Sequence, residues 1–364
     1  MGLPEKIREI EEEMKRTQIH KHTEHHIGLL KAKLAKLKAE QEVSQRSRSG
    51  GGTGFELKKG GDCTVVLIGL PSVGKSTILN HVTNAKSKVA AYAFTTLTVV
   101  PGLFEYKGAK VQILDLPGII SGAATGSGKG KRVLSVARNA DLILLVLDVF
   151  QPDQISVLKK ELYEIGIRLD TRPPKVTLER STSGGLGITV ACKLTKLTEA
   201  TIRGILNVYK IHDGNIIVRE DITDDQLIDV ISGNRNYIPT LTVLNKIDLV
   251  NSKFIEEAKN RIDEDFIPIS ADQNVNLEQL KEAIYNKLNF IRIYLKPRSG
   301  PPDFKEPLIV TAGSTVTDVC TRIHRKFAGE AKYALVSGKS VRFNPQRVGL
   351  DHVLQDRDVV TIIK

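Results

Sequence analysis

The chain has 364 residues, of which 41% are hydrophobic and 26% charged, and this composition excludes a disordered or fibrous protein. At about 150 residues per domain, the length suits two or three domains. The 53 Lys and Arg residues outnumber the 42 Asp and Glu residues, which gives a formal net charge of +11. A cationic excess of this size indicates an anionic partner, with nucleic acid as the first candidate and a merely soluble basic surface as the alternative.

The three cysteines, Cys63, Cys192 and Cys320, lie far apart and form no C-x-x-C pair. This spacing argues against a disulfide framework and against a zinc finger, and it fits the reducing cytoplasm. The N-terminal residues alternate in charge and lack the apolar core of a signal peptide. Because the apolar run 142–147 is too short to span a bilayer, we expect a cytoplasmic protein with no membrane partner.

Residues 1–50 are predicted to form a basic, helical N-terminal arm. Apolar residues recur every three or four positions between 7 and 14, and again between 30 and 37 among several lysines. We expect this apolar stripe to pack on another helix or on the body of the protein. The Ser- and Gly-rich stretch 44–54 then predicts a flexible linker.

A phosphate-binding pattern, G-x-x-x-x-G-K-[ST], follows the linker. It lies between an apolar run at 64–68, predicted to be a buried strand, and a predicted helix at 76–82. In this context glycines let backbone N–H groups converge on phosphates, and the helix N-terminus adds its positive end. We expect Lys75 to reach the β- and γ-phosphates and the Ser76 hydroxyl to coordinate Mg²⁺. The nucleotide-binding residues predicted here are Gly69, Leu70, Pro71, Ser72, Val73, Gly74, Lys75, Ser76 and Thr77.

Two further segments have the spacing of nucleotide-sensing switches. Thr95 and Thr96 lie where a GTPase places a threonine that ligates Mg²⁺ and senses the γ-phosphate. A predicted strand at 111–114 ends in Asp115, which opens the sequence D-L-P-G. We expect Asp115 to hold Mg²⁺ through water and the Gly118 N–H to meet the γ-phosphate. The residues around them that we assign to the nucleotide site are Leu116, Pro117 and Ile119.

A predicted strand at 241–244 ends in the pattern N-K-x-D, which selects guanine. The Asp248 carboxylate can accept both N–H groups on the Watson–Crick edge of guanine, whereas adenine would leave it unpaired, which argues against an ATPase. After a predicted strand at 266–269, a backbone N–H of Ser270 or Ala271 could meet the guanine carbonyl. The four strand-end motifs together predict a GTP- and GDP-binding domain. The residues assigned to guanine are Asn245, Lys246, Asp248, Ser270 and Ala271.

With these motifs the chain resembles the DRG proteins, the developmentally regulated GTP-binding branch of the Obg-type GTPases, over nearly its full length. The resemblance implies GTP hydrolysis, and that Thr96 rather than Thr95 ligates Mg²⁺. The residues that we assign to catalysis are Lys75, Thr96 and Gly118. The resemblance also implies an action linked to ribosomes and translation, and a dedicated protein partner. The stretches that carry the resemblance are 23–37, 90–97, 115–120 and 233–235.

Two positions depart from a simple GTPase. Ile119 follows Gly118, where Ras-like enzymes place a glutamine that orients water. Because an aliphatic side chain makes no hydrogen bond to water, we expect slow hydrolysis, or reliance on another group, a cation or a partner. In related GTPases that use K⁺, an asparagine of the phosphate loop helps to bind the ion, and here that position is Ser72, so a role for K⁺ stays open. Slow turnover also keeps open an alternative, a nucleotide-gated RNA- or protein-binding module that hydrolysis only resets.

The chain between Asp148 and Asn245 is longer than a β-α-β crossover needs. Predicted strands and helices at 167–236 indicate a small α+β insertion, either a packing module or a site for partner docking. The last segment resembles the β-grasp TGS domain in its order of elements. Its predicted strands lie at 307–311, 332–335, 340–343 and 358–364, and its predicted helix at 316–327.

Residues 290–364 hold thirteen Lys and Arg against seven Asp and Glu, a net charge of +6. RNA binding through phosphate contacts is the hypothesis that this excess favours, and a basic protein-docking face is the alternative. The candidate RNA contacts are Arg322, Arg325, Lys326, Arg342 and Arg347.

The predicted fold class is α/β, a P-loop GTPase domain with three additions. These are an N-terminal helical arm, an α+β insertion and a C-terminal β-grasp domain. The predicted boundaries are 1–50 for the arm, 55–166 and 237–289 for the two parts of the GTPase domain, 167–236 for the insertion, and 290–364 for the C-terminal domain.

Overall fold

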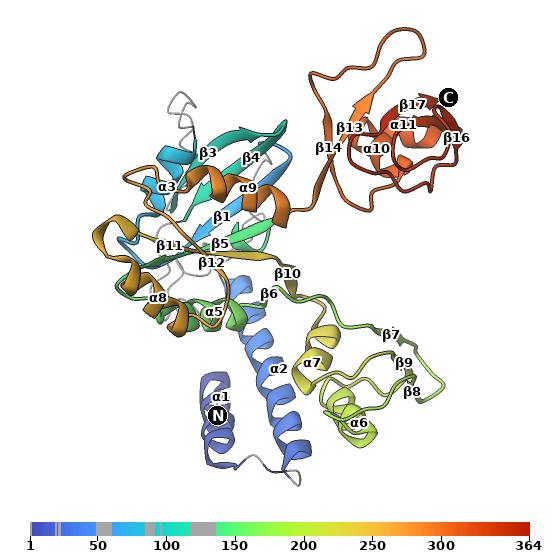
Figure 1. Cartoon of the computed structure of the whole chain (residues 1–364). Coiled ribbons are helices and arrows are strands. Elements are labelled where there is room, and N and C mark those ends of the chain that lie inside the picture. Colours follow the sequence, from blue (N-terminus) through green and yellow to red (C-terminus); the bar gives the residue numbers. More distant parts are fainter. Residues whose placement is uncertain are drawn as a thin grey trace. The chain divides into compact units, whose positions relative to one another are not determined.

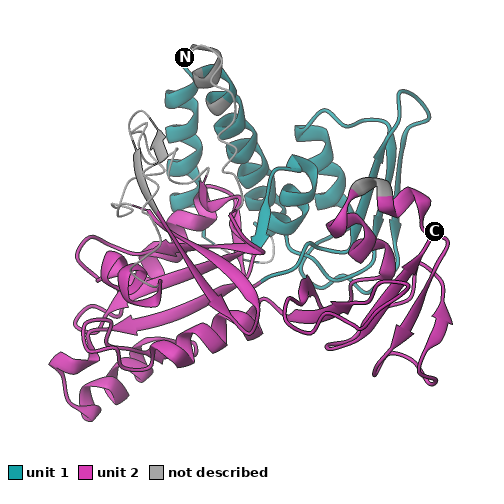
Figure 2. Ribbon diagram, turned by 90° about the horizontal axis from the view of Figure 1, so that it is seen from above, with its two compact units in different colours: residues 1–55, 171–237 teal, residues 56–170, 238–364 magenta. Residues whose placement is uncertain are grey.

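The structure, a computed structural model, describes residues 2–18, 20, 23–48, 60–83, 92–94, 97–116 and 136–364. The chain divides into two compact units (Figure 2). The first contains residues 1–55 and 171–237, and the second contains residues 56–170 and 238–364. Within the described ranges, none of the helices combines the length and the apolar character needed to cross a membrane.

The larger of the two main sheets in the second unit has seven strands and lies between helices (Figure 1). The strand order is β12-β11-β5-β1-β4-β3-β2. The strands from β12 to β4 run parallel, and β3 and β2 are antiparallel additions at one edge. The carboxyl ends of the parallel strands therefore meet at one edge of the sheet. The strands are β1 (Cys63–Ile68), β2 (Tyr92–Phe94), β3 (Leu97–Tyr106), β4 (Ala109–Asp115), β5 (Leu142–Asp148), β11 (Thr240–Asn245) and β12 (Phe266–Pro268).

Helices cover both faces of this sheet, because β1 and β5 are apolar on both sides. In β1, Val65 and Leu67 pack with α3 (Lys75–Val82) and α9 (Leu277–Lys287). The alternate residues, Val66 and Ile68, pack with α5 (Gln154–Glu164) and α8 (Ser252–Arg261) on the opposite face. This buried, doubly covered sheet fixes the loops that follow its strands.

The first unit joins the N-terminal helices to the inserted segment. Helix α2 packs through Ala32 against α6 and α7. The Lys31 ammonium bridges Asp224 and Asp225 at the start of α7, at 3.0 and 2.9 Å. The arm and the insertion are predicted from the sequence as separate segments, and in the structure they pack together in one unit. The elements are α1 (Leu3–Arg16), α2 (Glu24–Arg48), β7 (Val176–Arg180), β8 (Leu186–Val190), α6 (Glu199–Val208), β9 (Gly214–Val218) and α7 (Asp224–Ser232), and the short strands β6 (Ile167–Leu169) and β10 (Asn236–Ile238) lie next to the boundaries.

The C-terminal domain is a five-stranded sheet in the order β14-β13-β17-β15-β16, with β13 and β17 parallel in its middle. Helix α10 packs on it through Val316, Val319 and Cys320. The elements are β13 (Phe290–Leu295), β14 (Leu308–Thr311), α10 (Val316–Ile323), α11 (Arg325–Glu330), β15 (Tyr333–Ser337), β16 (Gln346–Val348) and β17 (Val359–Ile363).

Two predictions for this domain were wrong in detail, and one strand was missed. The strand predicted at 340–343 is a loop, because side chains rather than a neighbouring strand bind its backbone, and the strand β16 begins at Gln346. The single predicted helix breaks at His324, whose backbone is extended. Strand β13 was not predicted, although its alternating burial is that of a half-covered strand.

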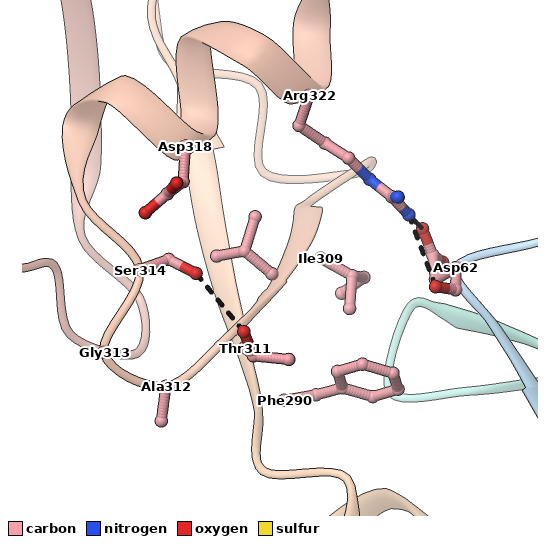
Figure 3. Close-up of a pocket in the computed structure, with 10 residues that line it drawn as sticks. Asp62, Phe290, Ile309, Thr311, Ala312, Gly313, Ser314, Asp318 and Arg322 are labelled. Atoms are coloured by element: carbon pink, nitrogen blue, oxygen red, sulfur yellow. Dashed lines mark hydrogen bonds and ion pairs between the residues drawn. The ribbon is translucent and has the colours of Figure 1, made fainter. Parts of the chain in front are cut away.

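The C-terminal domain contacts the rest of the second unit at the amino end of β1 (Figure 3). The Arg322 guanidinium donates to Asp62 Oδ1 over 3.0 Å. A hollow of about 450 Å³ lies beside this ion pair, lined partly by Phe290 and Ile309. Next to it Tyr106, Tyr285 and Phe290 pack edge to face. This contact lies at the opposite end of β1 from the phosphate-binding loop.

Candidate nucleotide-binding site

The loop between β1 and α3 holds a buried cation. Lys75 is 7% exposed, and its ammonium donates to the carbonyl oxygens of Gly69 at 3.0 Å and Leu70 at 2.8 Å. Burial lowers the pKa of this ammonium from its ordinary value of 10.5, and the nearby Asp115 carboxylate opposes the shift. A buried ammonium that neutral carbonyls solvate favours an anionic ligand, because an anion offers it a charge-assisted hydrogen bond.

A glycine is required at the turn into α3. Gly74 has φ +94°, which glycine adopts without strain, and a Cβ at this position would lie 2.2 Å from Asn245 Nδ2. The absence of a side chain lets the asparagine approach the loop. Asn245 Nδ2 donates to the Val73 carbonyl over 2.9 Å, and Asn245 Oδ1 accepts from the Ala271 N–H over 3.0 Å. One buried amide thus connects three segments that are remote in sequence.

Oxygen atoms converge beside Lys75. The Ser76 hydroxyl, at the start of α3, donates to Asp115 Oδ2 at the end of β4 over 2.5 Å. Asp115 Oδ1 is buried and has no hydrogen-bond partner among the described residues. A buried carboxylate oxygen without a partner is costly, and Mg²⁺ prefers carboxylate and hydroxyl oxygens as ligands. The donor set at this position fits a magnesium ion.

The loop after β11 places an acidic side chain at the surface. Lys246 has φ +70°, and its ammonium pairs with Asp148 Oδ2 at 2.7 Å. Asp248 follows in a short 3-10 helix, η1 (Ile247–Leu249), and its side chain is exposed. No hydrogen bond or ion pair of Asp248 is found within the described part of the chain. Its carboxylate is therefore available to a ligand.

The residues after β12 use their backbone donors within the protein. The Ser270 N–H donates to the Val275 carbonyl over 3.2 Å, and the Ala271 N–H donates to Asn245 Oδ1. Ser270 and Ala271 are both buried. A guanine carbonyl would therefore have to share or displace one of these donations.

The predicted site residues within the described ranges come from four segments: the phosphate loop, β4, β11 and the loop after β12. The structure brings these segments together at one edge of the sheet. Leu116 contributes its side chain to the core and can offer only its backbone to a ligand. Asp148, the partner of Lys246, was given no role from the sequence. Asp148 ends β5 directly opposite Asn245 at the end of β11, and this pairing of strand ends could have pointed to Asp148 as a site residue. The predicted residues Thr96, Pro117, Gly118 and Ile119 lie outside the described residues.

Among the described residues, no three His, Cys, Asp or Glu side chains gather as in a zinc site.

Three family models cover most of the chain. The one described as 50S ribosome-binding GTPase matches residues 64–180, the one described as the C-terminal region of that domain matches 183–290, and the one described as TGS domain matches 291–364.

Curated relatives align over the full length of the chain. An uncharacterized GTP-binding protein of Methanocaldococcus jannaschii is 53% identical, and the match covers 100% of this chain and 93% of that protein. Developmentally-regulated GTP-binding protein 1 of Xenopus laevis is 47% identical over 100% of this chain and 99% of that protein. Developmentally-regulated GTP-binding protein 2 of Homo sapiens is 46% identical over 100% of both.

Proposed function

Since this chain belongs to the family of developmentally regulated GTP-binding proteins, it binds and hydrolyses GTP, and we propose that this hydrolysis serves translation through contact with the ribosome or RNA. The observation that carries the enzymatic assignment is the buried Lys75 ammonium beside an Asp115 oxygen that has no hydrogen-bond partner among the residues described. The proposed setting is the cytoplasm, with GTP and GDP as ligands and a dedicated protein partner.

We propose the following roles at the phosphates. The Lys75 ammonium exchanges the carbonyls of Gly69 and Leu70 for the β- and γ-phosphates, and it stabilises the charge that develops as water attacks. Bound Mg²⁺ supplies charge neutralisation at the phosphate oxygens. Ser76 and Thr96 would hold it directly, and Asp115 through water. The Gly118 N–H would donate to the γ-phosphate.

At the base, the proposed reader is Asp248. Its exposed carboxylate can accept the two N–H groups of guanine, and Asn245 and Lys246 shape the loop that carries it. Ser270 or Ala271 would meet the guanine carbonyl by sharing a backbone N–H that now donates within the protein. Selection of guanine over adenine then follows from the cost of leaving the carboxylate unpaired.

We propose that intrinsic turnover is slow. Ile119 has no group that orients the attacking water, so acceleration is left to another group, to K⁺ or to a partner. Ser72 stands where K⁺-dependent relatives use asparagine, and K⁺ binding here would rest on backbone carbonyls. A slow enzyme also suits the second candidate function, a nucleotide-gated RNA- or protein-binding module in which hydrolysis is the reset.

Two observations support the link to translation. The family model matched by residues 64–180 is described as a 50S ribosome-binding GTPase. The C-terminal domain carries thirteen Lys and Arg against seven Asp and Glu, and such an excess attracts RNA phosphates.

The experiment that tests the proposal is GTP turnover in K⁺ and in Na⁺ buffer, with and without purified ribosomes. We expect ribosomes to raise the rate well above that of the free protein, and co-sedimentation with ribosomes to depend on GTP. Slow turnover together with GTP-dependent co-sedimentation would favour the binding module. If ribosomes neither bind the protein nor alter its turnover, the translation role is wrong for the protein alone.

A further inference from the structure

An aromatic side chain stands out of the C-terminal domain. Phe343, in the loop between β15 and β16, is 73% exposed, more than any other large hydrophobic side chain that the structure describes. It lies outside the hydrophobic core of that domain. A single exposed apolar side chain is common on a protein surface, so the ring gains meaning only from the loop and the charges around it.

The loop that carries Phe343 is fixed by side-chain hydrogen bonds. Gln346 Oε1 accepts from the backbone N–H groups of Arg342 at 3.0 Å and Phe343 at 3.3 Å. Asn344 Oδ1 accepts from the Gly338 N–H at 2.8 Å, which closes the loop at its other end. The ring is therefore presented by an ordered loop, and a ligand would meet it with little further loss of conformational entropy.

The chain around this ring is basic, although the buried Asp358 carboxylate accepts from the Ser340 N–H in the same loop at 3.4 Å. Residues 331–350 contain four basic residues and no acidic residue. Arg347 lies with its guanidinium 4.0 Å from the centre of the Tyr333 ring. Lys339 and Arg342 are exposed and have no carboxylate of the described residues within ion-pair distance. Uncompensated cations beside an exposed ring attract a ligand that is both anionic and planar. The four basic residues are Lys332, Lys339, Arg342 and Arg347.

We propose that the Phe343 loop is a stacking platform for an unpaired nucleotide of RNA. The ring would cover one face of a base while Lys339 and Arg342 contact the adjoining phosphates. A duplex does not fit this chemistry, because its bases are stacked on one another and offer no free face, whereas loops and ends of RNA do. This inference rests on the RNA contact proposed above, and it names the residue and the form of RNA.

The test uses the full chain and a fluorescein-labelled 12-nucleotide oligouridylate that carries one 2-aminopurine. Anisotropy gives the affinity, and quenching of the 2-aminopurine fluorescence reports stacking. A blunt-ended duplex without a loop or an overhang, with the same number of phosphates, is the comparison ligand. For Phe343→Ala we expect affinity for the single strand to fall about tenfold and the quenching to be lost. Phe343→Trp should keep both.

Phe304→Ala is the matched control. Phe304 is 61% exposed on the same domain, but its charged neighbours in sequence, Asp303, Lys305 and Glu306, carry no net positive charge, and its ring contacts Tyr294. We expect RNA binding to be unchanged in this variant. Arg342→Ala should reduce the slope of log affinity against log salt by about 0.7, the value for one phosphate contact of a single strand. Binding of a fluorescent GDP should be unaltered in every variant, and thermal unfolding that matches the wild type shows that the C-terminal domain is folded.

The outcomes separate the two proposals. If the wild-type protein binds the single strand with a salt-dependent affinity but Phe343→Ala binds equally well, the stacking platform is wrong and the RNA contact stands. Equal affinity of the wild type for the duplex and the single strand would also overturn the platform. If the wild type binds neither RNA, the RNA contact fails as well, and the ribosome experiment then decides whether a protein face is used instead.

Discussion

Replacement of Asn245 by alanine tests whether one buried amide connects the parts of the nucleotide site. The side chain is 2% exposed, and it donates to the Val73 carbonyl and accepts from the Ala271 N–H. Alanine removes both hydrogen bonds and leaves the two backbone groups without partners. Because the site is closed to water at this position, neither group regains its lost bond cheaply.

The expected cost follows from these two groups. A buried backbone group that loses its partner costs about 1–3 kcal/mol, so the pair should cost about 2–4 kcal/mol after partial relaxation. Local opening of the segment after β12 should become about 30-fold to 1000-fold more frequent, at 1.4 kcal/mol for each factor of ten. Hydrogen–deuterium exchange of a peptide spanning residues 266–276, read by mass spectrometry, measures this change. Affinity for a fluorescent GDP should fall in the same variant.

Asn251→Ala is the control for this prediction. Asn251 caps α8 by accepting from the Phe254 N–H over 3.1 Å, at an exposed position. Its replacement should cost about 1 kcal/mol locally and leave exchange of the 266–276 peptide unchanged. If Asn245→Ala exchanges at the wild-type rate in that peptide and binds GDP as tightly, the connection we describe does not hold the site together.

Three further predictions concern selectivity, the domain contact and pH. Asp248→Asn should shift preference from GTP toward XTP by at least about tenfold in a competition assay, because one charge-assisted acceptor is lost; unchanged selectivity would refute the guanine assignment. Gly108→Ala should destabilise the protein more than Gly313→Ala in urea, because both have positive φ but only at Gly108 would a Cβ meet Pro307, at 2.7 Å; equal losses would refute the contact. Burial opposes ionisation of Asp356, but hydrogen bonds from Arg292 of β13 outweigh it and hold the pKa of the Asp356 carboxyl below its ordinary value of 3.8. The ionised carboxylate therefore stabilises the folded protein fully above pH 3.8, and this stabilisation is lost as the pH falls through the lowered pKa. Since this carboxylate is 40% exposed, solvent screening limits its contribution to about 1 kcal/mol, and Asp356→Asn should lose that much at pH 7 and progressively less as the pH falls below 3.8 in thermal unfolding.

The parts of the fold that local pattern determines were predictable from sequence. The strand predicted at 64–68 is confirmed as β1, and the helix predicted at 76–82 is confirmed within α3. Apolar runs with this length and these flanking glycines leave few alternatives. The GTPase family is confirmed by the relatives, because its motifs must follow particular strands in a particular order.

Features that depend on long-range contact were not predictable. The packing of α2 on α6 joins segments separated by more than a hundred residues, and their apolar faces do not specify which helix they meet. The hydrogen bond from the Ala271 N–H to Asn245 was equally unpredictable, because the two residues lie on different segments. From the sequence, this N–H was expected to be free to bind guanine. One local feature was missed as well: the loop at 340–343 contains β-forming residues, but its backbone N–H groups donate to the Gln346 side chain instead of to a neighbouring strand.

GTP turnover by the wild-type chain and by Lys75→Ala, measured in the same Mg²⁺ buffer with and without ribosomes, tests the central claim most directly. The buried Lys75 ammonium is the charge that we place on the β- and γ-phosphates, so the variant should bind GTP weakly and show no turnover under either condition. Wild-type turnover should be measurable and rise with ribosomes. Full activity in Lys75→Ala would contradict the assignment of this site.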